Sequence, residues 1–138
     1  METSALARAY LHDDTSAQAD LTAALASADA VVSSALTIVE LRRAVGQVTA
    51  SQRVPQERAT EALRRALEIL SKADVIPLGE LILARAGGAF PLPIRTLDAL
   101  HVATALEVQL RPGVTAVVMM SRDKRVKDVA AAVGIQLV

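Results

Sequence analysis

The chain has 138 residues, of which 52% are hydrophobic, so it can bury a sizeable core and is predicted to fold as a single domain over residues 1–138. Fifteen basic residues balance fifteen acidic ones, which argues against a protein that coats nucleic acid through a broad positive surface. The absence of cysteine excludes disulfides and thiolate metal sites, and it fits a protein of the reducing cytoplasm.

The amino-terminal half of the chain predicts two helices, a strand and two more helices. In chain order these are "ALARAYL" at 5–11, "TSAQADLTAALASAD" at 15–29, "AVVSS" at 30–34, "LTIVELRRAVGQV" at 36–48 and "QERATEALRRALEILSKA" at 56–73. A hydroxyl at Thr3 or Ser4 is expected to cap the first helix, and one at Thr15 or Ser16 the second.

The second half predicts three more strands that alternate with three helices. In chain order these are "DVIPL" at 74–78, "GELILARAGGAF" at 79–90, "TLDALHVATALEVQL" at 96–110, "VTAVVMM" at 114–120, "SRDKRVKDVAAAVG" at 121–134 and "IQLV" at 135–138. The 96–110 helix is apolar on nearly every side and is expected to be central and buried. Gly134 suits the position just past a helix C-terminus. The alternation predicts an α/β sandwich with a parallel sheet of four strands, around a core of aliphatic side chains.

Four acidic residues occupy places where α/β sheets gather functional groups, at the ends of strands and on the helices that follow them. They are Glu2, Glu40, Asp98 and Asp123. Each also has an ordinary structural explanation. The two aspartates lie at helix starts, where a carboxylate interacts favourably with the helix dipole. Glu40 could pair with Arg43 three residues on, and Glu2 could be a solvated charge at the terminus.

The surroundings of Asp98 favour a functional role for that residue. The helix around it is almost entirely apolar, and a carboxylate is costly to bury unless a cation meets it. Arg95 or a divalent metal could supply the positive charge. His101 is within reach of Asp98, and we expect a neutral imidazole held by hydrogen bonds rather than a metal ligand.

Four blocks of the sequence, in order, resemble the motifs of the PIN-domain ribonucleases and most closely those of the VapC toxins. They are "ETSALARAYL", "VSSALTIVELRRAV", "IRTLDALHVATAL" and "VVMMSRDKRVKDVAAAVGIQLV". The third block is the most specific, and the set spans nearly the whole chain. The resemblance implies a PIN-like three-layer sandwich, a parallel sheet flanked by helices.

The resemblance also implies a site and a set of partners. Glu2, Glu40, Asp98 and Asp123 would be the catalytic, metal-binding acids that hold Mg²⁺ or Mn²⁺. Hydroxyls at Thr3, Ser4 and Ser121 would support them. The cations expected to contact RNA phosphates are Arg42, Arg43, Arg95 and Arg122. Family members cut RNA, tRNA or rRNA in the case of the toxins, and they pair with a cognate antitoxin and usually form homodimers.

The chain departs from the family pattern in two ways. The first acid is Glu2, where the family usually has Asp, and one more methylene moves the carboxylate. The apolar central strand that precedes this acid in the family has no counterpart, because only Met1 comes before it. We therefore expect a first central strand that is missing or truncated, with a start that lies upstream of Met1 as the favoured explanation.

Other functions fit the sequence less well or would need a lost activity. A catalytically weakened PIN-fold binding module that keeps the antitoxin-binding groove is the main alternative. A phosphate-accepting signalling domain would need an acidic pair after its first strand, and Asp13-Asp14 follows the first helix instead. Walker-type and Rossmann nucleotide binders are disfavoured, because neither glycine motif occurs. No apolar run approaches the roughly 20 residues of a membrane span.

Overall fold

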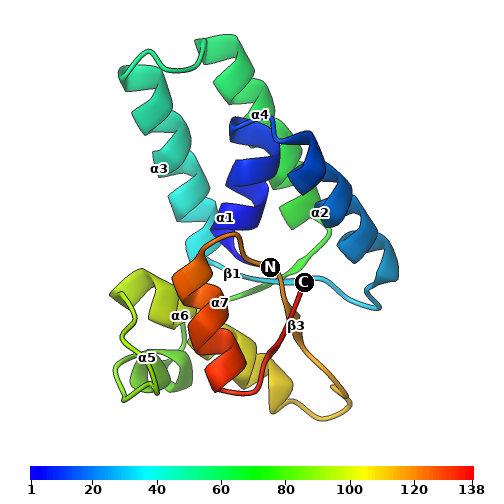
Figure 1. Ribbon diagram of the computed structural model, residues 1–138, viewed down its shortest axis with the longest axis vertical. Helices are drawn as coiled ribbons and strands as arrows, with labels where there is room; N and C mark the ends of the chain where they lie inside the picture. The colour runs from blue at the N-terminus through cyan, green and yellow to red at the C-terminus, as the bar shows by residue number, and fades with distance from the viewer.

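A computed structural model describes all residues, 1–138, as short parallel strands flanked by helices on both sides (Figure 1). The helices are α1 (Thr3–Leu6), the π-helical turn η1 (Ala7–Leu11), α2 (Thr15–Ser27), α3 (Leu36–Ala50), α4 (Gln56–Leu70), α5 (Glu80–Ala86), α6 (Thr96–Gln109) and α7 (Lys124–Ala132). The strands are β1 (Val32–Ser34), β2 (Asp74–Ile76), β3 (Val118–Met119) and β4 (Gln136–Leu137). Every predicted helix and strand is present, and the predicted α/β class is confirmed.

The strands form two separate parallel pairs instead of the one continuous sheet that the alternation predicts. β1 pairs with β2, and β3 pairs with β4. The strand predicted at 114–120 is reduced to Val118–Met119. β4 is the one strand that pairs with β3, so the backbone groups on the other side of β3 have no strand as a ladder partner.

Met1 and Glu2 join the two pairs of strands. The amino group of Met1 donates to the carbonyl oxygen of Val32 in β1 at 2.8 Å. The amide of Glu2 donates to the carbonyl oxygen of Met120, just after β3, at 3.1 Å. These two residues thus link β1 to the end of β3, although they form no strand of their own. Beyond them lies a mostly apolar groove of about 180 Å³, lined by residues of both edges and by Val138, which places the two termini close together (Figure 1).

The core is aliphatic, as predicted, and it divides over the two sides of the strands. The larger cluster joins α1, α2, α3 and α4 through small and branched side chains, namely Ala5, Leu6, Ala9, Ala17, Leu21, Leu41, Ala66, Leu70 and Met120. The other side is built on α6, whose buried residues include Ala99, Val102 and Ala103, so the predicted central position of this helix is confirmed. None of the helices has both the length and the hydropathy to cross a bilayer.

Carboxylates cap the first two helices, and the hydroxyl caps predicted from the sequence are wrong. The side chain of Glu2 accepts a hydrogen bond from the amide of Ser4, and that of Asp14 accepts one from Ala17. An ionised oxygen makes a stronger bond to a free amide than a hydroxyl does. Gly134 adopts φ 82° directly after α7, which confirms its predicted role as the residue that ends that helix.

In a protein whose first residue is Met1, burial of the amino group makes stability depend on pH. Burial lowers the pKa of the Met1 ammonium to about 6, against an opposing effect of the Glu2 charge. Between pH 6 and pH 8 the unfolded chain therefore binds more protons than the folded chain, and the free energy of unfolding falls as the pH is lowered. We expect a loss of about 1–3 kcal/mol between pH 8 and pH 6, measured by urea unfolding.

The control for this prediction is the same protein acetylated at its amino terminus. The acetyl group leaves an amide in place of the titrating amine, while His12 and His101 are unchanged. The acetylated protein should lose most of the stability difference between pH 8 and pH 6. An equally large difference in the acetylated protein would show that the amine is not the cause.

Candidate metal centre

Glu2 is a buried carboxylate held by three donors. Its side chain is only 6% exposed, which contradicts a solvated terminal charge. One oxygen accepts from the amide of Ser4 at 3.0 Å, and the other accepts from the hydroxyls of Ser4 and of Ser121, the latter at 2.8 Å. Because Glu2 is also fixed by its backbone bond to Met120, its carboxylate is held in place by both the strand edge and α1.

Glu40 projects from the first turns of α3 toward α1 and α6. Its Oε2 accepts a hydrogen bond from the hydroxyl of Thr3 and lies 2.7 Å from Nε2 of His101, which is buried. Burial acts to raise the pKa of Glu40, but the hydrogen bonds from His101 and Thr3 outweigh it and hold that pKa below its usual value. Glu40 thus remains a carboxylate, and it makes no ion pair with Arg43.

Asp98 lies in the first turn of α6, half-buried and without a hydrogen bond to either oxygen. Burial and the negative charges of Asp123, Glu2 and Glu40 raise the pKa of Asp98, and the positive charge of Arg95 opposes them only in part. This carboxylate is thus under electrostatic stress that a cation would relieve. His101, which the sequence places within reach of Asp98, is hydrogen-bonded to Glu40 instead.

Asp123 is the exposed N-cap of α7. Its Oδ1 accepts from the amide of Arg125 at 2.8 Å, so the capping role expected for an acid at this position is present. Its own amide donates to the hydroxyl of Ser121 at 3.1 Å, and the same hydroxyl bonds Glu2. Oδ2 makes no hydrogen bond, so Asp123 can cap a helix and still offer one oxygen to a ligand.

The structure brings the four acids together to different degrees. Glu2 and Glu40 meet closely, because one oxygen of each and a ring nitrogen of His101 lie within 4.8 Å of one another. Asp98 and Asp123 stand outside that group, although the negative charges of Asp123, Glu2 and Glu40 all act to raise the pKa of Asp98. Carboxylate oxygens are the ligands that Mg²⁺ and Mn²⁺ prefer. The free oxygens of Glu40, Asp98 and Asp123 therefore fit such an ion by their chemistry.

Comparison with known proteins identifies the family that carries this site. Residues 1–132 match the sequence model of the PIN domain family. The chain belongs to the PIN-domain family. It is also 36% identical over 107 residues to Ribonuclease VapC46 of Mycobacterium tuberculosis (strain ATCC 25618 / H37Rv), an alignment that covers 78% of this chain and 72% of that protein. No solved structure matches the chain.

The hydroxyls predicted to support the acids of this PIN domain all contact a carboxylate. Thr3 bonds Glu40, while Ser4 and Ser121 bond Glu2. Sequence reasoning missed a further pair, Ser33 and Thr37, which are buried and 3.0 Å apart. The hydroxyl of Ser33 donates to the carbonyl oxygen of Met1 and so anchors the residue before Glu2. The spacing of four between these two hydroxyls was the available signal.

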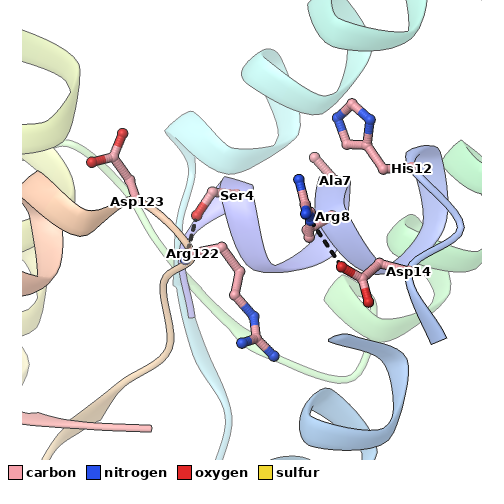
Figure 2. A pocket seen from close by; sticks show the side chains of 7 residues that line it. All are labelled: Ser4, Ala7, Arg8, His12, Asp14, Arg122 and Asp123. Atoms are coloured by element: carbon pink, nitrogen blue, oxygen red, sulfur yellow. Dashed lines mark hydrogen bonds and ion pairs between the residues drawn. The ribbon is translucent and has the colours of Figure 1, made fainter. Parts of the chain in front are cut away.

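A second omission concerns the surface next to the acids. A polar cleft of about 470 Å³ runs from Asp123 along α1 and η1, and its lining includes Arg8 and His12, neither of which the sequence singled out (Figure 2). Of the four arginines predicted to contact RNA, Arg122 alone lines this cleft. All four are exposed.

The substitution Ser121→Ala measures how much the hydrogen bonds of Ser121 contribute to the stability of the site. Its hydroxyl is fully buried, donates to Glu2 and accepts from the amide of Asp123, so Ser121→Ala leaves two polar groups short of a partner. We expect a loss of about 1–3 kcal/mol in the free energy of unfolding, measured with urea. Ser71→Ala, which removes an exposed hydroxyl at the end of α4, should cost less than about 0.5 kcal/mol. Equal effects would mean that Ser121 does not hold the acids.

Proposed function

We propose that this PIN domain is a divalent-metal-dependent endoribonuclease, the toxin of a toxin–antitoxin pair, that hydrolyses RNA phosphodiester bonds. The observation that carries the proposal is the meeting of Glu2 and Glu40, 38 positions apart in the chain, beside the stressed carboxylate of Asp98. A relative named a ribonuclease supports the reaction type. Carboxylates that raise one another's pKa are costly for stability, and such a cost is typical of functional sites.

Glu2, Glu40, Asp98 and Asp123 are the residues that would hold Mg²⁺ or Mn²⁺. A divalent cation bound there supplies a water of lowered pKa and neutralises charge on the phosphoryl oxygens. The protein contributes the orientation of its carboxylates. Hydrogen bonds from Thr3 and His101 keep Glu40 ionised and fixed. Hydrogen bonds from Ser4 and Ser121 fix the position of the Glu2 side chain. No Ser, Cys or His is needed as a covalent nucleophile.

The proposed substrate is held mainly through its backbone. The chain has one Tyr, one Phe and no Trp, so few side chains can stack on bases. The exposed side chains of Arg42, Arg43, Arg95 and Arg122 are candidates for phosphate contacts. Recognition would then depend on the shape of a folded RNA, and tRNA or rRNA is the proposed target class.

The proposed setting is that of a toxin in the cytoplasm. A cognate antitoxin would bind this domain and keep it inactive, and two copies would form a homodimer. Both proposals rest on the likeness to the VapC toxins. Co-expression with a candidate antitoxin and measurement of the mass of the complex in solution would test them together.

The site assignment is tested by RNA cleavage. The purified protein should cut a folded RNA with Mg²⁺ or Mn²⁺ present and should stop when EDTA is added. Asp98→Asn should reduce cleavage at least 100-fold, because it removes a charge from the proposed cation site. Asp128→Asn changes an exposed acid on α7 that pairs with Lys124, and it should leave cleavage unchanged. Full activity of Asp98→Asn would contradict the assignment.

A catalytically weakened binding module is the second candidate, and Glu2 is the observation that favours it. Its longer side chain bonds the hydroxyls of Ser4 and Ser121 with one oxygen and the Ser4 amide with the other, which leaves it less free to meet a cation. A nuclease should be stabilised by Mn²⁺, by about 2.7 kcal/mol at a free concentration 100 times Kd. A weakened module should show almost no such thermal shift, and Glu2→Asp should restore both the shift and cleavage.

A further inference from the structure

The polar cleft begins at Asp123, the one proposed site acid that lines it. Seven residues line it, of which one is apolar, and they are Ser4, Ala7, Arg8, His12, Asp14, Arg122 and Asp123. Figure 2 shows Asp123 at one end and His12 at the other, with Ser4 and Arg122 between them. A ligand that reaches from the acids along α1 and η1 must therefore cross this cleft.

Each of the two arginines of the cleft pairs with an acid, Arg8 with Asp14, which also lines the cleft, and Arg122 with Asp20. Nε of Arg8 donates to Asp14 at 2.9 Å, and Nη2 of Arg122 donates to Asp20. Asp14 is itself fixed, because it accepts from the hydroxyl of Ser16 and the amide of Ala17. A guanidinium has five N–H donors, so each arginine keeps several that its acid does not use. Arg8 in particular retains both of its Nη groups.

This arrangement suits a phosphodiester better than a free carboxylate or an apolar ligand. The fork of N–H donors on a guanidinium matches the two non-bridging oxygens of a phosphate. An orientation fixed before binding lowers the entropy lost when the contact forms. Asp14 and Asp123 in the lining balance the charges of Arg8 and Arg122, so the cleft would attract single phosphates weakly. A strand that is already bound at the acids would gain from every additional contact.

We propose that this cleft is the path of the RNA strand next to the cleaved bond, and that Arg8, His12 and Arg122 bind its phosphates. The proposal rests on the proposed ribonuclease function and adds the direction in which the bound RNA strand extends from the acids. Arg8 and His12 are positioning residues, because they lie along the cleft away from the acids. The side chains that line the cleft include no aromatic ring other than the His12 imidazole, so the contacts would be independent of sequence.

Binding of a labelled RNA to the Asp98→Asn protein, at several salt concentrations, tests the cleft apart from catalysis. Arg8→Gln and His12→Gln, each added to Asp98→Asn, should raise Kd, by about tenfold for the arginine. Loss of one phosphate contact should also lower the slope of log K against log salt by about 0.7. Arg8→Lys keeps the charge but loses the fork, and it should recover part of the affinity and all of the slope.

Arg58→Gln is the matched control. Arg58 is exposed like Arg8 and pairs with Asp13, so Arg58→Gln removes the same charge from a nearby ion pair. Arg58 does not line the cleft, so the lining is unchanged. It should change Kd less than twofold. Equal effects of Arg8→Gln, His12→Gln and Arg58→Gln on Kd and on the salt slope would overturn the proposal.

Cleavage kinetics separate this proposal from the proposed function. In the otherwise unmodified protein, Arg8→Gln should raise KM for RNA about tenfold with little change in kcat, because it contacts the strand away from the reacting bond. If Arg8→Gln and His12→Gln leave RNA cleavage and its KM unchanged, the ribonuclease function stands and the cleft proposal is wrong. If the protein binds RNA through the cleft but does not cut it, the cleft proposal stands and the ribonuclease function is wrong.

Discussion

The pairing of Met1 and Glu2 with two strand edges is the interaction on which the site depends. One hydrogen bond ties Met1 to Val32, and another ties Glu2 to Met120. Between them they set the position and direction of the chain where α1 begins. Thr3 and Ser4 follow at once, and their hydroxyls reach Glu40 and Glu2. A displacement of this short segment would therefore move Glu2 itself and the hydroxyls of Thr3 and Ser4, which order the carboxylates.

The pKa values of two acids of the site, Glu40 and Asp98, are shifted in opposite directions, and Thr3 of the same segment contributes to this difference. Donors from α1 and α6 surround Glu40 and lower its pKa, whereas Asp98 has no donor and its pKa is raised by burial and by its acidic neighbours. Neighbouring carboxyls whose pKa values are pushed apart commonly take different roles in catalysis. Glu40 is a fixed, ionised anchor. Asp98 is the group whose charge gains most from a cation, so its ionisation and the binding of that cation should favour each other.

Much of the local structure follows from the sequence, because helix periodicity and buried apolar runs are local signals. Helices α3, α4 and α6 lie where the spacing of Leu, Ile, Val and Ala predicts them. The division of the sheet into two pairs could not be predicted in this way, because strand pairing joins remote segments. The pairing partners of β3 are not encoded in residues 114–120 themselves. The helix caps were misjudged for a related reason. Glu2 and Asp14 outcompete the hydroxyls beside them only once the turns bring an amide within reach.

The candidate acids could be named from the sequence, but their partners could not. A histidine three positions after Asp98 is as near to it along α6 as any side chain, yet His101 faces Glu40 of another helix. That choice depends on how α1, α3 and α6 pack. Ala5 of α1 and Ala99 and Ala103 of α6 are almost fully buried, and side chains this small let neighbouring backbones approach closely. A core built from such residues has little room for aromatic rings, and the same shortage leaves the surface few rings on which bases can stack. A core and surface poor in aromatic rings therefore suit the proposed recognition of RNA through its phosphates.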